Sequence, residues 1–173
     1  MESGGAVRSS LSGRIAFIAQ WIVPVVFTFF LFWGRAFVGA ELGWLSVVGI
    51  LFAIVMVVLL YIAPVLTIFD RDVRPTGTAR SSYAMVSLLL WIALFVMAIS
   101  VPDQADGPPL PTALTVWTHG GISIEMSSFI FTLAFVFGAI MWVATITLAI
   151  MGIVRSRRPQ GTAVPRPGAF AAS

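Results

Sequence analysis

Four long apolar stretches separated by polar connectors dominate the pattern of this sequence. Each is long enough to cross the hydrocarbon core of a bilayer as a helix, which takes about 20 residues. They cover residues 15–33, 44–69, 83–101 and 126–154, and none contains Asp, Glu, Lys, Arg or His. The pattern predicts an all-α integral membrane protein, folded as an up-down bundle of four transmembrane helices.

The predicted helices span about residues 15–34, 44–68, 83–101 and 126–154, inside a single membrane domain of residues 14–155. The flanking segments, 1–13 and 156–173, are polar or rich in Pro, Gly and small residues, so both are predicted to be disordered. Pro24 and Pro64 lie inside the first two stretches. Each removes a backbone donor, so each is predicted to kink its helix.

Composition agrees with a membrane protein and excludes some chemistry. The 173 residues are 59% hydrophobic and 10% charged, whereas about a quarter of a soluble domain is charged. The connectors are too short to hold a separate soluble domain. The chain has no cysteine, which excludes disulfides, thiolate metal sites, cysteine nucleophiles and the four-helix membrane enzymes that make disulfides.

The basic residues predict the orientation. All ten are Arg, and only Arg35 lies in the first connector, while the third connector, from 102 to about 125, has none. Because Arg concentrates on the cytoplasmic side, the amino and carboxyl termini are both predicted to be cytoplasmic. Arg without Lys, with abundant Ala, Gly and Val, is typical of a GC-rich bacterial genome, so the expected location is a bacterial plasma membrane. Orientation explains the basic charge without a nucleic-acid partner.

The amino end allows a second interpretation. Two arginines, an apolar stretch and the small residues 38–40 also fit a cleavable signal peptide. The apolar stretch has 19 residues, whereas a signal core has about 7 to 15, so an uncleaved first helix is the favoured prediction.

The third connector is expected to be external and to carry structure of its own. Two β-prone stretches, 114–119 and 122–125, flank a Gly-Gly pair, which predicts a small β-hairpin. Two alternatives remain open. One is a short interfacial helix with Leu110, Leu114 and Trp117 on one face, and the other is an irregular loop.

Three residues are candidates for a functional role. Gln20 is the most polar residue within the apolar stretches, and it can bind a neighbouring helix or a substrate. His119, the only histidine, and Glu125 lie in the third connector near Asp103 and Asp106. The spacing of these side chains matches no metal-ligand pattern, so no metal or cofactor is expected. Glu125 also fits the amino end of the fourth helix, where the helix dipole favours a carboxylate.

Other residues within the stretches predict contacts between helices. Small residues four positions apart, Gly49 with Ala53 and Ala134 with Gly138, allow close helix packing. The remaining polar side chains are expected to form hydrogen bonds between helices or within their own helix; they are Thr28, Thr67, Ser87, Thr132, Thr145 and Thr147.

Three functions fit these patterns, in a fixed order of preference. The first is a non-catalytic accessory or scaffold subunit that packs against a larger membrane complex. The second is a small homo-oligomeric transporter or channel for a neutral solute, because four helices rarely enclose a pathway alone. The third is an interfacial enzyme that uses His119 or Glu125. The expected partners are the lipid bilayer and either another membrane protein or further copies of this chain.

Overall fold

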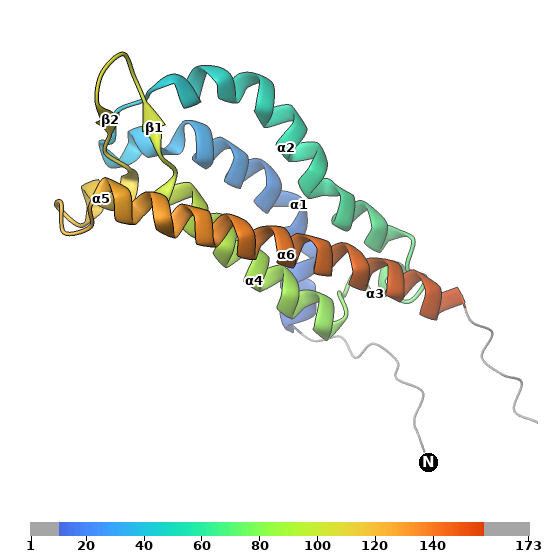
Figure 1. The fold of residues 1–173 in the computed structure, drawn as a ribbon. Coiled ribbons are helices and arrows are strands. Elements are labelled where there is room, and N and C mark those ends of the chain that lie inside the picture. Colours follow the sequence, from blue (N-terminus) through green and yellow to red (C-terminus); the bar gives the residue numbers. More distant parts are fainter. Residues whose placement is uncertain (1–10, 158–173) are drawn as a thin grey trace, which may run out of the picture.

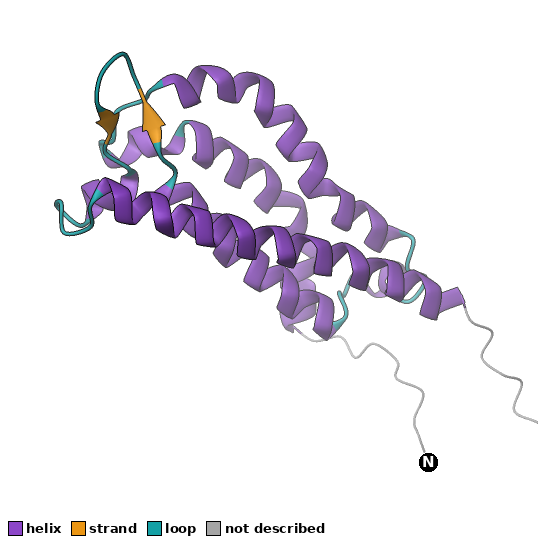
Figure 2. Ribbon diagram, in the orientation of Figure 1, coloured by secondary structure: helices purple, strands orange, loops and turns teal. Residues whose placement is uncertain are grey.

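The computed structural model describes residues 11–157, and the disorder predicted for residues 1–10 and 158–173 lies outside this part. The described chain is mostly helical, and four of its helices are long and apolar enough to cross a membrane (Figures 1 and 2). They are α1 (Leu11–Phe32), α2 (Trp44–Ile68), α4 (Ser81–Ser100) and α6 (Ile124–Arg157). Each coincides with one apolar stretch to within a few residues. Shorter elements connect them: η1 (Gly34–Val38), α3 (Val73–Thr76), β1 (Asp103–Gln104), β2 (Pro109–Leu110) and α5 (Ala113–Trp117).

Two helices extend into segments predicted to be disordered. Residues 11–13 belong to α1 and residues 156–157 belong to α6. Contacts with the connector after α2 explain both extensions. The Gly13 carbonyl accepts a hydrogen bond from the Ala79 N–H at 3.1 Å, and the Ser156 hydroxyl accepts one from the Arg71 N–H at 3.4 Å.

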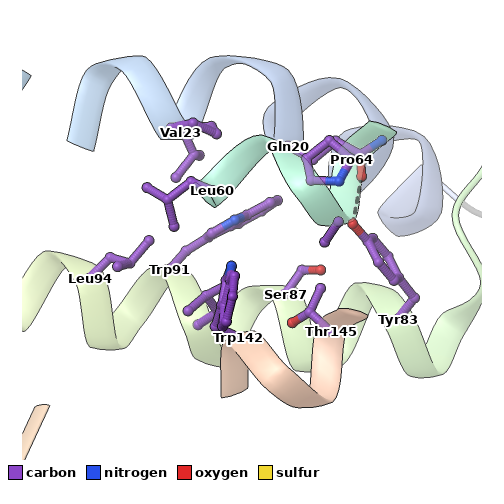
Figure 3. A pocket seen from close by; sticks show the side chains of 13 residues that line it. Gln20, Val23, Leu60, Pro64, Tyr83, Ser87, Trp91, Leu94, Trp142 and Thr145 are labelled. Carbon is purple, nitrogen blue, oxygen red and sulfur yellow. Dashed lines mark hydrogen bonds between the residues drawn. The ribbon is translucent and has the colours of Figure 1, made fainter. Parts of the chain in front are cut away.

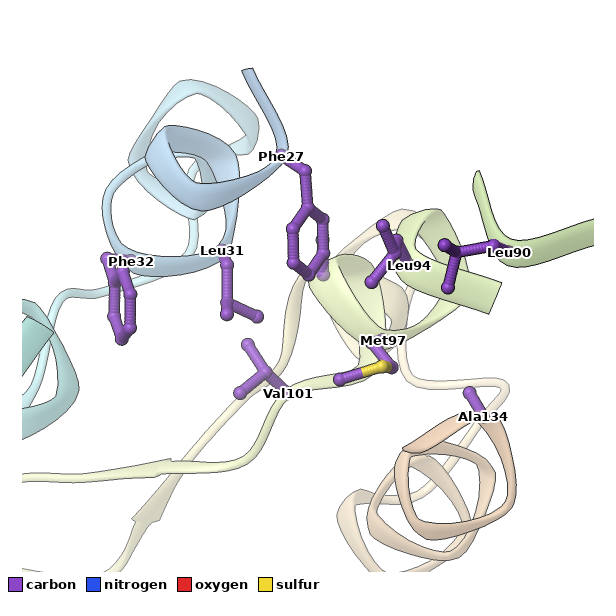
Figure 4. Close-up of a cluster of buried hydrophobic side chains, with 9 residues drawn as sticks. Phe27, Leu31, Phe32, Leu90, Leu94, Met97, Val101 and Ala134 are labelled. Carbon is purple, nitrogen blue, oxygen red and sulfur yellow. The ribbon is translucent and has the colours of Figure 1, made fainter. Parts of the chain in front are cut away.

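The long helices pack in neighbouring pairs. Helix α4 lies against α1 and α6, and α2 lies against α1 and α6. Apolar side chains of α1, α4 and α6 meet in a cluster, which we call the apolar cluster (Figure 4). Its buried members are Phe27, Leu31, Phe32, Leu90, Leu94, Met97, Ala98, Val101 and Ala134.

The predicted small-residue pairs lie at helix contacts. Gly49 is buried against the Phe32 ring, and a Cβ at this position would collide with that ring. On α6, Ala134 belongs to the apolar cluster. A Cβ at Gly138 would lie 3.5 Å from the Ala93 Cβ and the Met97 Sδ. The α1–α2 contact therefore depends on glycine itself, whereas the α4–α6 contact at Gly138 has room for a methyl group.

A buried ion pair holds the end of the molecule where β1, β2 and α5 lie, which we call the α5 end (Figure 1). The Arg35 Nη1 lies 3.1 Å from the Asp103 Oδ2, and the two side chains are 1% and 2% exposed. The Arg35 Nη2 also donates to the Pro111 carbonyl at 2.8 Å. Burial lowers the pKa of Arg35 from its ordinary value, and the charge of Asp103 opposes this shift.

Asp103 also caps α2 from a distant part of the sequence. Its carboxylate accepts hydrogen bonds from the N–H groups of Gly43 at 2.8 Å and Leu45 at 2.9 Å. A helix start leaves such donors without partners, and its dipole favours a negative charge. A Cβ at Gly43 would lie 2.7 Å from the Asp103 Oδ1, so glycine permits this close approach.

A second ionic cluster holds the opposite end, which we call the α3 end. The Arg80 Nε donates to the Asp70 Oδ2 at 2.9 Å, and its Nη2 donates to the Asp72 Oδ2 at 2.7 Å. The hydrogen bond to Asp70 is the main reason that the pKa of Arg80 is raised. Gly152 of α6 lies close by, because a Cβ there would be 2.5 Å from the Asp70 Oδ2. The cluster thus joins α2, α4 and α6.

The third connector differs from the predicted hairpin. Residues 113–117 form α5, and Ile124 begins α6, so no strands flank the Gly-Gly pair. The Thr112 hydroxyl caps α5 by accepting from the Thr115 N–H at 3.1 Å. Positive φ angles at His119 (50°) and Gly120 (82°) end this turn of helix. A two-residue antiparallel ladder forms earlier instead, where Asp103 pairs with Leu110 and Gln104 with Pro109. Local capping by Thr112 therefore outweighs the β preference of residues 114–119.

We expect Asp103→Ala to destabilise the protein more than Arg35→Ala. Removing Asp103 leaves a buried guanidinium without its counter-ion and uncaps α2, a loss of about 3–5 kcal/mol. Removing Arg35 leaves Asp103 with its three backbone donors, at a cost of about 1–3 kcal/mol. Thermal unfolding in detergent measures both. Asp106→Ala is the control, because Asp106 is exposed and accepts one hydrogen bond, from Trp44. An equal loss for Asp103→Ala and Asp106→Ala would contradict this assignment.

Candidate functional site

Polar side chains from all four long helices meet inside the protein. We call this set the polar layer; its members are Gln20 of α1, Thr67 of α2, Tyr83 and Ser87 of α4, and Thr145 of α6. All five are between 2% and 5% exposed. They lie between the apolar cluster and the ionic cluster at the α3 end.

Three of these side chains form one hydrogen-bonded chain. The Tyr83 hydroxyl donates to the Gln20 Oε1 at 2.9 Å, as Figure 3 shows, and the Gln20 Nε2 donates to the Thr67 Oγ1 at 3.3 Å. The Thr67 hydroxyl in turn donates to the Pro64 carbonyl at 2.7 Å. Gln20 therefore joins α1 to both α2 and α4. Such bonds between membrane helices are worth about 1 kcal/mol each.

A small cavity lies beside this chain of hydrogen bonds. Its volume is about 20 Å³, and Gln20, Tyr83, Ser87 and Thr145 supply the polar side chains of its wall (Figure 3). The Thr145 hydroxyl donates to the Met141 carbonyl of its own helix at 2.6 Å. The Ser87 Oγ is fully buried and makes no hydrogen bond of acceptable geometry with any residue in the range 11–157.

Pro24 and Pro64 face the same cavity from α1 and α2. Both prolines lie within helices that continue on either side. A proline has no N–H, so the carbonyl four residues earlier loses its helical donor. Those carbonyls belong to Gln20 and Leu60, and both residues line the cavity. Backbone acceptors and side-chain hydroxyls are thus concentrated in one small volume.

Aromatic donors join the helices around these prolines. The Tyr61 hydroxyl of α2 donates to the Trp21 carbonyl of α1 at 2.6 Å. The Trp142 Nε1 of α6 donates to the Leu59 carbonyl of α2 at 3.0 Å. Both bonds cross from one helix to the next near a proline, so α2 is tied to α1 and α6 by side-chain donors as well as by packing.

A second, smaller cavity lies between the polar layer and the ionic cluster. Its volume is about 10 Å³, and its wall includes Thr67, Asp70, Arg80 and Tyr83. Tyr83 lines both cavities, so its ring separates them. The two cavities form an interrupted polar column that runs from the α3 end to Ser87 and Thr145.

The three candidate residues from the sequence do not come together. Gln20 is at the centre of the polar layer. His119 and Glu125 are exposed, His119 in the turn after α5 and Glu125 in the first turn of α6. The Ser123 hydroxyl accepts from the Met126 N–H at 3.2 Å, so Ser123 caps the helix that carries Glu125.

Acidic residues near His119 in sequence are engaged elsewhere. Asp103 pairs with Arg35, and Asp106 accepts from the Trp44 side chain at 3.2 Å. Within residues 11–157, no three His, Asp or Glu side chains come together as metal ligands. The third connector therefore shows no geometry that would support metal binding or general-base catalysis by His119.

Sequence reasoning missed several residues of this region. It named Thr67, Ser87 and Thr145 as separate helix contacts, and it placed Tyr83 only at the edge of an apolar stretch. One signal was available: all five residues of the polar layer fall in the half of their stretch nearer to an arginine-bearing segment. The ion pairs of Arg35 and Arg80 were missed because the arginines were used only to predict orientation.

Comparisons with known proteins give no match: no protein family fits the chain, and no curated protein or solved structure is significantly similar to it. The chemistry of the site must therefore be argued from its own residues. The polar layer has no charged side chain and no base beside a nucleophile. It can bind and orient a small neutral molecule, and it can join helices.

We expect Gln20→Leu and Tyr83→Phe to be non-additive. Each substitution alone breaks the bond between Tyr83 and Gln20, so the double variant loses less stability than the sum of the single variants. The expected coupling is about 0.5–1.5 kcal/mol. Unfolding in detergent measures it. Pairing Tyr61→Phe with Gln20→Leu provides the control, since Tyr61 donates to a different acceptor. Additive losses for Gln20 and Tyr83 would show that this bond contributes nothing.

Proposed function

We propose that the four long helices form an up-down bundle in a bacterial plasma membrane, with the α3 end in the cytoplasm. The distribution of exposed charge supports this orientation. Among residues 11–157, Arg14 and the arginines near α3 and the end of α6 are exposed and in no ion pair with one another's neighbours; they are Arg14, Arg71, Arg74, Arg155 and Arg157. The exposed acids Glu41, Asp106 and Glu125 lie at the α5 end.

The absence of native cysteine makes the orientation easy to test. A single cysteine at His119 should react with a membrane-impermeant thiol reagent added to intact cells, because His119 is exposed in the proposed external connector. A single cysteine at Pro75, exposed in the proposed cytoplasmic connector, should react only after the cells are opened. The reverse result would overturn the proposed orientation.

The proposed role is that of an accessory or scaffold subunit that packs against a larger membrane complex. The observation that carries this proposal is the exposure of α2. In this helix 6% of the membrane-length apolar segment is buried inside the protein, compared with 39% in α1 and in α4. Helix α2 is fixed chiefly at its two ends, by Asp103 and by the cluster around Asp70. An isolated chain thus presents most of α2 to its surroundings.

The interior supports a structural role more than a transport role. The polar layer is used for contacts between helices, and its larger cavity measures about 20 Å³. Two wider grooves, of about 300 and 210 Å³, are lined by apolar side chains. No polar path of solute size crosses the described part of the chain. The charge-free polar layer is also unsuited to coupling with protons.

Native mass spectrometry of the protein extracted gently from its own membrane tests the role. We expect a heteromeric mass that contains a larger membrane protein. Leu51→Trp with Ile54→Trp alters the exposed face of α2 and should release that partner. The control is Ile18→Trp with Ile22→Trp, which makes the same change on the exposed face of α1. A lone monomer would overturn the scaffold proposal, and a homo-oligomer would support transport instead.

A further inference from the structure

We propose that the cavity of the polar layer is a hydration site for one water molecule, which enters from the α3 end and is stopped by the apolar cluster. A cavity needs about 10–15 Å³ to hold a water molecule, and this one measures about 20 Å³. The site is independent of the proposed scaffold role, because it rests only on the interior of the chain.

The wall of the cavity offers the partners that a water molecule needs, about three hydrogen bonds. The Ser87 hydroxyl is a donor and acceptor with no partner of its own in the described chain. The Thr145 hydroxyl spends its proton on the Met141 carbonyl, so its oxygen is left as an acceptor. The carbonyls of Gln20 and Leu60 are further acceptors, because Pro24 and Pro64 cannot donate to them.

Water satisfies this set better than an ion. The lining has no carboxylate and no cationic side chain. A bare cation in such a site would lose its hydration without gaining a counter-charge, which is costly in a medium of low dielectric. A neutral molecule that can donate two hydrogen bonds and accept one matches the acceptors and the Ser87 hydroxyl.

The smaller cavity provides the entry route. It is about 10 Å³ in volume, near the minimum for one water molecule, and it lies against Asp70 and Arg80 at the α3 end. Tyr83 separates it from the hydration site, so a displacement of this ring admits water from that end. Beyond the site, Leu90 and Leu94 of the apolar cluster complete the wall and offer no polar partner.

Thiol infrared spectroscopy tests the hydration site, because the chain has no native cysteine and a single S–H band reports on each introduced thiol. Ser87→Cys in phospholipid vesicles should exchange S–H for S–D soon after transfer to D₂O. The control is Ala98→Cys, equally buried but within the apolar cluster, and its S–H should exchange far more slowly. Equal protection of the two thiols would overturn the proposal. Thr145→Cys provides the same readout if Ser87→Cys fails to fold.

A matched pair of substitutions tests the direction of entry. Ala149→Val narrows the smaller cavity, whereas Ala134→Val adds the same methyl groups in the apolar cluster. Combined with Ser87→Cys, only Ala149→Val should slow the exchange, by tenfold or more. Slowing by Ala134→Val alone would place the entry at the α5 end and overturn the proposed route.

Discussion

Asp103 has to balance a buried cation and cap a helix at the same time, and the arrangement at the α5 end follows from that double requirement. Its carboxylate contacts Arg35 after α1, the first turn of α2, and the segment that follows α4. A buried guanidinium is costly without a counter-ion, so these three segments are held at fixed positions. The Arg80 cluster has the same effect at the other end, where it joins α2, α4 and α6. The long helices are therefore fixed at their ends by charge and along their length by apolar packing.

Between these ends, the interior is divided by polarity rather than by shape. The apolar cluster occupies the part of the interior toward the α5 end, and the polar layer occupies the part toward the α3 end. In a membrane, burial of apolar side chains adds little, because lipid is as apolar as the protein core. Hydrogen bonds and close packing must then specify which helices meet. Gln20 does this for three helices, and Gly49 does it for the contact between α1 and α2.

The sequence was sufficient for the four long helices, because a stretch of some twenty apolar residues without charge has few other structures in a membrane. It was not sufficient for the connectors. Residues 114–119 are β-prone, yet Thr112 caps a helix there, and the short ladder forms at Asp103 and Leu110, where side-chain contacts hold it. The polar layer was within reach of sequence reasoning, since its members share a position in their stretches. The ion pairs were not, because no local pattern connects residues so far apart.

The distance along the chain between Asp103 and the groups it binds has a consequence for synthesis. Gly43 precedes Asp103 by 60 residues. At about 5–20 residues per second, the ribosome needs about 3–12 s to make that interval. During this time the hairpin of α1 and α2 has already left the ribosome, with Arg35 unpaired and the start of α2 uncapped. The first hairpin thus has to wait in the insertion machinery or at the lipid surface until α4 is complete, and this delay gives a chaperone or an assembly partner its best opportunity to bind.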